Sequence, residues 1–404
     1  MKAVVLGGGG LTGRCTVRDL ARNGHFSEIT VADLDAELAR SAASAAGGRG
    51  VRAETVDARD PASLARVLGG ADVCVNAVQY TFNLEVMGAC LEAGVPYLDF
   101  GGLFHMTRRQ LEWDGKFRKR KLLAIPGLGQ VPGVSNVLAA QATGDLDRVD
   151  SISIRDGWRD FTEGGPEVLF TWSPSTFLDE MEKAAAVFED GQFRDYPAMS
   201  GAEEFDFPAP VGRTRVYRTL HSEPATLVPF LAGKGVRHVE WKEGGPGIDV
   251  LRTMSLLGLG SSRPVKVRGQ EVVPREFILA LLRREGLLGI PPGVTVNDWE
   301  VCDLEIHGES SGRPVHRHAQ ARFPPKPEWG LSATEYAVGV CGAIGAEMIV
   351  DGTIAAVGVV PPEGCVPAGP FRAALAERGI ETTIHPPEPP LPAVDPRPRK
   401  GGKM

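Results

Sequence analysis

The sequence predicts an α/β protein, in which a Rossmann-type doubly wound parallel sheet is joined to an α+β substrate domain with a mixed or antiparallel sheet. Short apolar runs and helical patterns alternate six times before residue 125, an order that builds a parallel sheet covered by helices on both faces. From about Val149 the strands instead alternate apolar and polar residues, so one face of their sheet should be polar. A capping box at Ser332 and Glu335 then opens a long helix of small residues.

The elements of the first part follow in regular order. Strands are expected at residues 2–6, 29–32, 52–56, 72–77, 96–100 and 122–125. The helices between them end in glycines such as Gly24, Gly69 and Gly94, which are common helix stops. In the middle part helices are expected at about 174–189 and 275–285, and near the end at about 332–350 and 371–378.

These patterns predict two domains and a tail. A dinucleotide-binding domain covers 1–133 and is completed by 332–385, whereas 134–331 forms the substrate and dimerisation domain. Residues 386–404 form a Pro-rich tail, expected to be disordered because this composition cannot bury enough apolar surface to offset the entropy of ordering.

Composition excludes several classes of protein. The 404 residues carry a net charge of −7, which argues against binding nucleic acid or an anionic membrane surface, since both need a basic face. The most apolar stretch, 337–346, is short and Gly-rich, and the six cysteines form no CxxC pair. We therefore expect a soluble, reduced, cytoplasmic protein, and a homodimer.

A dinucleotide site is predicted at the N-terminus, where a GxGxxG pattern follows a strand and opens a helix. Gly8 should permit the tight turn, Gly10 should let the backbone approach a pyrophosphate, and Gly13 should let helix and strand pack closely. With Leu11 and Thr12, these residues would place the phosphates at the helix N-terminus, which favours anions. Asp33, at the end of the second strand, is expected to bind the ribose hydroxyls. Its carboxylate would repel a 2′-phosphate, so NAD is favoured over NADP.

Two further segments are expected near the cofactor. Asp57 and Ala58 follow the third strand beside the predicted adenine pocket, although Asp57 could equally be a turn residue before a helix. The fourth strand ends in Asn76, Ala77 and Val78, where the backbone of such folds runs along the ribose.

Several stretches together resemble the saccharopine dehydrogenase-like oxidoreductases, most closely their lysine ε-dehydrogenase and carboxynorspermidine dehydrogenase members. The matching stretches are 30–35, 76–83, 92–102, 127–133, 358–363 and 377–380. The resemblance implies an NAD(P)-dependent enzyme that oxidises or forms a C–N bond at an amine-bearing carbon, with a split nucleotide domain. The chain departs from the family at Gln130 and at 155–158, so the chemistry could be kept while the substrate differs.

Acid–base candidates follow from strand ends, because ligands of open parallel sheets bind beyond the carboxyl ends of the strands. Tyr80 matches a tyrosine that lines the active site in relatives, and His105 follows the next strand, so both are expected to face one cleft. His221 lies in the stretch 220–224, which resembles a loop that contacts the substrate in the family. Each could instead be a packing or helix-approach residue. Imine chemistry needs a proton shuttle, which suits His or Tyr.

Substrate contacts are expected from residues that follow the strands or begin a helix. Arg155 could bind a carboxylate, although a solvated strand end is the alternative that we favour for it, and Ser173 is an N-cap whose helix could bind one. The full set of expected substrate-binding residues is Gln79, Gly102, Gln130, Arg155, Trp158, Trp172 and Ser173.

No metal site is predicted. His316 and His318 share one side of a strand, but the sequence shows no third ligand beside them. Three functions stay open: an amine or amino-acid dehydrogenase, the leading interpretation; the reductive coupling of an amine with an aldehyde or keto acid; and a cofactor-binding regulator without turnover. The expected partner is a small amine or amino-acid substrate.

Overall fold

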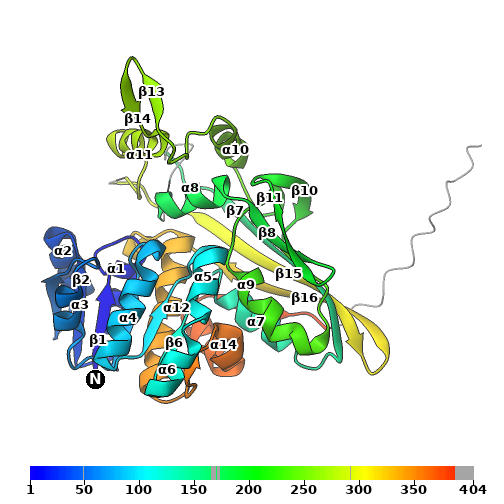
Figure 1. Cartoon of the computed structure of the whole chain (residues 1–404), viewed down its shortest axis with the longest axis horizontal. Helices are drawn as coiled ribbons and strands as arrows, with labels where there is room; N and C mark the ends of the chain where they lie inside the picture. The colour runs from blue at the N-terminus through cyan, green and yellow to red at the C-terminus, as the bar shows by residue number, and fades with distance from the viewer. Residues whose placement is uncertain (49, 165–169, 171–172, 292, 387–404) are drawn as a thin grey trace, which may run out of the picture.

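The computed structural model describes residues 1–404 except 49, 165–169, 171–172, 292 and 387–404. Trp172 and nearly all of the expected Pro-rich tail therefore lie outside the described residues. Two sheets form the framework, one on each side of a central layer of helices (Figure 1).

The first sheet is parallel and has seven strands in the order β17-β6-β5-β4-β1-β2-β3. This arrangement confirms the Rossmann-type fold. Its strands are β1 (Lys2–Leu6), β2 (Glu28–Asp33), β3 (Val51–Thr55), β4 (Val73–Asn76), β5 (Tyr97–Asp99), β6 (Leu123–Ile125) and β17 (Gly358–Val359).

Helices cover both faces of this sheet, because its strands are apolar on both sides. Residues such as Val5 and Val75 pack with one helical layer, and their neighbours Val4 and Cys74 pack with the other. The first layer contains α1 (Gly13–Asn23), α2 (Ala36–Ala46) and α12 (Ala333–Val350). The second contains α3 (Pro61–Leu68), α4 (Asn83–Ala93), α5 (Leu103–Leu111) and α6 (Asp114–Arg120).

Helix α12 is long and apolar enough to cross a membrane by length and composition, but 78% of it is buried inside the protein. Its glycines make this burial possible. A Cβ atom at Gly339 would lie 2.4 Å from the Cβ of Cys15, and one at Gly345 would lie 2.4 Å from Leu128 Cδ2. The small residues therefore let α12 pack against the sheet as a core helix, as the sequence predicts.

The second sheet is mixed, as expected, with the main order β10-β11-β12-β7-β15-β16-β18; β12 and β7 are parallel, and β8 and β9 extend it from β12. Its strands are β7 (Arg148–Asp160), β8 (Ala185–Glu189), β9 (Gln192–Tyr196), β10 (Ser200–Asp206), β11 (Arg213–Arg218), β12 (His238–Gly244), β15 (Asp298–Ser310), β16 (Arg313–Phe323) and β18 (Glu381–Ile384). One face packs on α7 (Val134–Thr143), α9 (Glu223–Leu231) and α12, so both sheets share one apolar core.

One helix expected in the middle segment differs in the structure. The helix expected over 174–189 ends early: α8 covers Pro174–Glu182, and the apolar run after it forms β8. A projecting arm follows, made of α10 (Ile248–Leu256), the β13–β14 hairpin (Val265–Val267 and Gln270–Val272) and α11 (Pro274–Arg284). The remaining helices are α13 (Pro362–Cys365), α14 (Ala368–Glu377) and three short 3₁₀ turns, η1 (Tyr80–Phe82), η2 (Ala232–Lys234) and η3 (Pro327–Trp329).

The C-terminal segment is divided between the two sheets. β17 pairs with β6 in the first sheet, whereas β18 pairs with β16 in the second, with Ala319 opposite Ile384. We propose that residues 1–133 and the segment from 332 through α14 form one domain. The expected limit of 385 is corrected by the position of β18.

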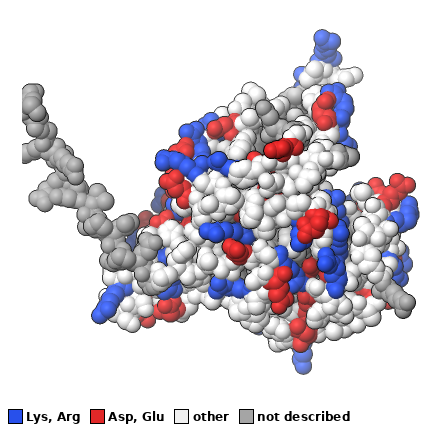
Figure 2. Space-filling view, turned by 180° about the vertical axis from the view of Figure 1, so that it is seen from behind, with Lys and Arg blue, Asp and Glu red and all other residues white. Residues whose placement is uncertain are grey.

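Charged side chains of both signs are interspersed on the face opposite to that of Figure 1 (Figure 2). The basic run Arg118–Lys121 lies at the end of α6. Asp114 on the same helix accepts a hydrogen bond from Arg118 at 2.7 Å. That cluster is an exposed helix end.

Candidate active site

A cavity of about 450 Å³ lies between the glycine-rich loop of the first sheet and the second sheet. It continues from the phosphate-binding turn, past the ends of β4 and β5, to β7, α8, β12 and β15. Expected residues that line it are Gly10, Leu11, Thr12, Ala77, Val78, Gln79, Tyr80, Gln130, Trp158, Ser173 and His221.

The glycine-rich loop has the shape that a pyrophosphate requires. A Cβ atom at Gly13 would lie 2.1 Å from the carbonyl oxygen of Gly7, so only glycine lets α1 approach β1. A Cβ atom at Gly10 would meet only that same oxygen, at 3.2 Å, and Gly10 lines the cavity. The tight turn itself is made by Gly7, with a φ of +71°, and not by Gly8 as expected; Gly8 packs against Val31. These residues fit a dinucleotide.

Asp33 ends β2 beside this loop. Its Oδ2 accepts a hydrogen bond from the Gly9 backbone N–H at 3.0 Å, and its Oδ1 accepts one from Asp35 at 3.1 Å. The carboxylate is thus fixed next to the glycines, as a ribose-binding group would be, and NAD preference stays a prediction. Asp57 instead forms an ion pair with Arg59, whose hydrogen bonds lower the pKa of Asp57 to about 2. Neither Asp57 nor Ala58 lines the cavity.

Asn76 is a buried residue that holds the end of β4 in place through hydrogen bonds. Its Nδ2 donates to Asn83 Oδ1 and to Tyr97 Oη, both at 3.0 Å, and its Oδ1 accepts from the Val78 N–H at 3.3 Å. The side chain is 1% exposed and does not line the cavity. Asn76 therefore shapes the end of β4, whereas Ala77 and Val78 form the surface that a cofactor would meet.

The other end of the cavity is acidic, which the sequence reasoning missed. Six carboxyl side chains line it, from β7, α8, β12 and β15, and no Lys or Arg lines it within the described part of the chain: Asp156, Asp160, Glu180, Glu243, Asp298 and Glu300. Strand register brings them together, since Glu243 and Asp156 are paired across β12 and β7, and Asp298 and Asp160 across β15 and β7. The sequence signal that could have found them is the even spacing of acidic residues within one strand, 156 and 160 in β7 and 298 and 300 in β15, which places each pair on one face.

Burial and repulsion from neighbouring carboxylates raise the pKa values of Asp156, Glu180, Glu243 and Asp298. Burial, and then the charge of Glu300, raise the pKa of Asp156 well above its usual value; burial and Glu243 do the same to the pKa of Glu180. Burial raises the pKa of Asp298 to about 7. Asp156 Oδ1 and Glu180 Oε2 are buried without a hydrogen-bond partner among the described residues. Such groups are costly unless a ligand supplies donors or positive charge.

His221 is the imidazole of the cavity. Its ring stacks on Trp241, and its Nδ1 is hydrogen-bonded to the carboxylate of Glu223, which also accepts from Ser135 Oγ at 2.9 Å. Burial alone would lower the pKa of His221, but attraction and the hydrogen bond from Glu223, with the charge of Glu243, outweigh burial and raise this pKa. With Nδ1 held by Glu223, Nε2 is the nitrogen available to a substrate.

Tyr80 lines the cavity, but its hydroxyl links η1 to α8. It donates to Asp179 Oδ2 on α8 at 2.5 Å and accepts from Lys183 Nζ at 2.9 Å, while Arg275 holds the other oxygen of Asp179. Burial, and then the hydrogen bond to Asp179, raise the pKa of Tyr80. This environment favours a positioning role over proton transfer.

Three further expected site residues lie outside the cavity. His105 is exposed on α5 and does not line the cavity, so Tyr80 and His105 do not face one cleft. Gly102 is buried, and a Cβ atom there would lie 2.9 Å from Gln110 Oε1; its neighbour Gly101 lines the cavity instead. Arg155 points to the far face of the second sheet, where it pairs with glutamates and not with the cavity.

Four of the expected substrate residues line the cavity: Gln79, Gln130, Trp158 and Ser173. Gln130 is fully buried, and neither its Oε1 nor its Nε2 has a partner among the described residues. Ser173 caps α8 and accepts from Thr176 Oγ1 at 2.9 Å. Trp158 Nε1 donates to the Pro246 carbonyl at 3.3 Å, so the indole walls the acidic end.

Comparisons with known proteins agree with this geometry. Over 94% of its length the chain is 25% identical to carboxyaminopropylagmatine dehydrogenase of Synechocystis, covering 96% of that protein. It is 25% identical to carboxynorspermidine synthase of Vibrio alginolyticus, with 85% of each chain covered. Its fold matches apo saccharopine dehydrogenase from Saccharomyces cerevisiae (TM-score 0.72, 17% identity, 95% and 100% covered) and homospermidine synthase from Legionella pneumophila (TM-score 0.65, 12% identity, 100% and 94% covered).

Two family descriptions account for nearly the whole chain. The saccharopine dehydrogenase NADP binding domain matches residues 3–125, and the saccharopine dehydrogenase C-terminal domain matches residues 129–380. The Rossmann-type sheet, the glycine-rich loop and the buried His221 lie within these limits. The chain belongs to the saccharopine dehydrogenase family and is an NAD(P)-dependent oxidoreductase acting on amine groups.

Proposed function

We propose that this enzyme joins a cationic amine of the diamine or polyamine class to a carbonyl compound by reductive coupling, which makes a secondary amine. The acidic end of the cavity carries the proposal: six carboxyls line it and, among the described residues, no Lys or Arg does. A substrate with a second positive charge would supply the donors that Asp156 Oδ1 and Glu180 Oε2 lack.

The residues of the cavity suit each step. The primary amine attacks the carbonyl carbon as the neutral amine; the resulting carbinolamine loses water to form an imine, which is then reduced. Glu223 raises the pKa of His221 and so favours its protonated form, which can donate a proton to the hydroxyl that leaves as water. The distal ammonium of the substrate is held by Glu180 and Asp156. A bound NAD(P)H supplies the hydride.

Reductive coupling is favoured over the oxidation of an amino acid such as lysine. Lysine bound in the acidic end would place its α-carboxylate among carboxyl groups with no cation beside it, because Arg155, the expected one, is engaged by Glu203 and Glu305 outside the cavity. The names of the curated relatives, carboxyaminopropylagmatine dehydrogenase and carboxynorspermidine synthase, refer to derivatives of polycationic amines. These observations support a polycation in the acidic end.

The test follows NADH and NADPH absorbance with a panel of amines: 1,3-diaminopropane, putrescine, agmatine, lysine and propylamine. Each amine is offered alone with NAD(P)⁺, and with NAD(P)H and a carboxylated aldehyde or 2-oxo acid. Consumption of NAD(P)H only when a diamine and a carbonyl compound are both present supports the proposal. Production of NAD(P)H from lysine alone would overturn it, and cofactor binding without turnover throughout would indicate a regulator.

We propose that the enzyme is a homodimer of the cytoplasm. Exposed apolar residues gather on the projecting arm, which gives self-association an apolar surface: Leu256, Leu257, Val265, Val267 and Phe277. All six cysteines are free, which suits a reducing compartment. Sedimentation velocity tests the dimer, and a monomer at micromolar concentration would contradict it.

A further inference from the structure

A cluster of imidazoles lies on the second sheet, on the face opposite to the cavity. Along β15, the inward residues Cys302, Leu304 and Ile306 are fully buried in the core. The residues between them therefore point to the other face, because side chains alternate along a strand. Across β15 and β16, Glu305 is directly opposite His318, and His307 is opposite His316.

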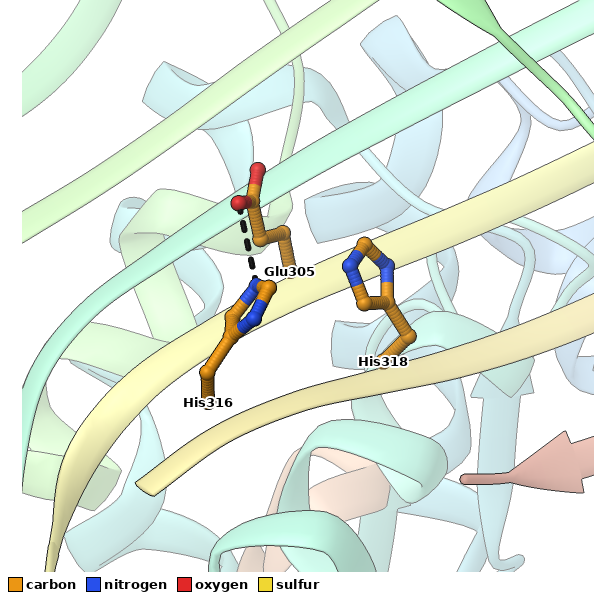
Figure 3. A group of neighbouring side chains, drawn as sticks. All are labelled: Glu305, His316 and His318. Carbon is orange, nitrogen blue, oxygen red and sulfur yellow. Dashed lines mark hydrogen bonds and ion pairs between the residues drawn. The ribbon is translucent and has the colours of Figure 1, made fainter. Parts of the chain in front are cut away.

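The geometry brings three potential ligands together. One ligand atom each of Glu305, His316 and His318 lies within 4.8 Å of the other two. His316 Nε2 is 3.2 Å from Glu305 Oε1, and both histidines rise from one strand toward the carboxylate (Figure 3). His307 Nε2 also lies 3.3 Å from Glu305 Oε1, and its ring stacks on His316. Three imidazoles thus surround one carboxylate.

Neighbouring groups orient these side chains. Asp303, 1% exposed, holds His318 Nδ1 at 3.0 Å and so fixes the orientation of the ring. Arg155 Nη1 donates to Glu305 Oε2 at 2.9 Å and so turns Oε1 toward the imidazoles. A carboxylate behind a metal-binding histidine is the usual outer contact in zinc sites.

We propose that Glu305, His316 and His318 bind a divalent transition-metal ion of the zinc type, with His307 or water as a fourth ligand. Nitrogen-rich ligand sets select such ions, whereas Mg²⁺ and Ca²⁺ take oxygen ligands. Ligands on a tetrahedral zinc ion lie about 3.3 Å apart, for bonds of about 2.0–2.1 Å, so modest side-chain rotations close the site. The ion ties β15 to β16 and is separate from the reaction.

The sequence reasoning rejected the His316/His318 pair because no third ligand was visible. The third ligand is Glu305, which lies 11 residues before His316 and meets it only through the antiparallel register of the two strands.

Cobalt binding tests the site in the full chain after dialysis against a chelator. We expect one Co²⁺ per chain with visible d–d absorption, displaced by Zn²⁺, and a melting temperature that rises with added Zn²⁺. His316→Asn and His318→Asn should each weaken Co²⁺ binding at least tenfold. Asp303→Asn, which touches no ion, should weaken it about tenfold through His318.

His25→Asn is the matched control, because it removes an exposed imidazole that is distant in the sequence from the cluster. This variant should bind Co²⁺ as the wild type does. Circular dichroism shows whether each variant is folded, and His316→Gln replaces His316→Asn if that one is not. The proposal is overturned if the wild type binds no stoichiometric Co²⁺, if His316 and His318 variants keep wild-type affinity, or if His25→Asn loses as much.

Discussion

His221 lies flat on Trp241, with ring centroids 3.8 Å apart and planes inclined by only 7°. The stack and the Glu223 hydrogen bond together fix the imidazole in the wall of the cavity. We predict that His221→Asn lowers kcat by about 10²–10⁴-fold, the usual cost of losing a positioned acid or base. The dissociation constant for NADH, measured by fluorescence, should stay near the wild-type value. A variant that keeps full kcat would remove His221 from the mechanism.

Glu180→Gln tests the binding of the distal cation. A hydrogen bond to a charged group contributes about 1.5–3 kcal/mol, so the KM for a diamine should rise by about tenfold to a hundredfold. The KM for propylamine, which has no second charge, should change little. Glu112→Gln, an exposed substitution on the surface, is the control. Equal effects on both amines would contradict the proposed role.

Tyr80→Phe separates positioning from proton transfer. The substitution removes the hydroxyl that links η1 to α8 but leaves Asp179 paired with Arg275 and Lys183. We predict a loss of about 1 kcal/mol in the free energy of unfolding and a fall in kcat smaller than tenfold. Urea denaturation and steady-state kinetics measure the two quantities. A fall in kcat as large as that of His221→Asn would make Tyr80 an acid or base after all.

Cofactor preference depends on Asp33. Its carboxylate should repel a 2′-phosphate, so we predict tighter binding of NADH than of NADPH. The double substitution Asp33→Ser and Leu34→Arg should reverse this order, because Leu34 is 62% exposed next to the ribose position and an arginine there can bind a phosphate. Titration by fluorescence gives both constants. Equal affinities in the wild type would exclude the proposed ribose contact.

Asp298 makes the stability of the ligand-free protein depend on pH. Its pKa rises from 3.8 to about 7 on folding, so the folded state binds this proton more tightly than the unfolded state does. The stabilisation is complete below about pH 4 and is lost as the pH rises toward 7. Asp298→Asn keeps the oxygen that accepts from the Ala333 N–H but does not titrate. Relative to wild type, this variant should gain stability between pH 5 and pH 8. A constant difference in melting temperature across that range would contradict the assignment.

The sequence predicts the nucleotide half well because its signals are local. A glycine-rich turn, Asp33 and regular strand–helix alternation all act within about 30 residues. The helix expected over 174–189 was wrong at its end, since Ala184–Phe188 is a short apolar run whose period fits helix and strand alike. The acidic end was missed because its carboxyls come from four elements that only the register of the second sheet brings together.

Helix α12 packs on α1 but is synthesised long after it, and this order affects how the nascent chain folds. When a ribosome has released β6, the α1 surface that will receive Gly339 still lacks α12, and Thr16 Oγ1 lacks the Gly339 carbonyl that it later contacts at 2.9 Å. The nascent chain therefore exposes the α1 surface around Cys15, which later packs against Gly339, to water while some two hundred further residues are made. The first third of the chain therefore completes its folding only when the C-terminal part has been made. Premature termination before α12 would leave an aggregation-prone fragment and not a smaller working domain.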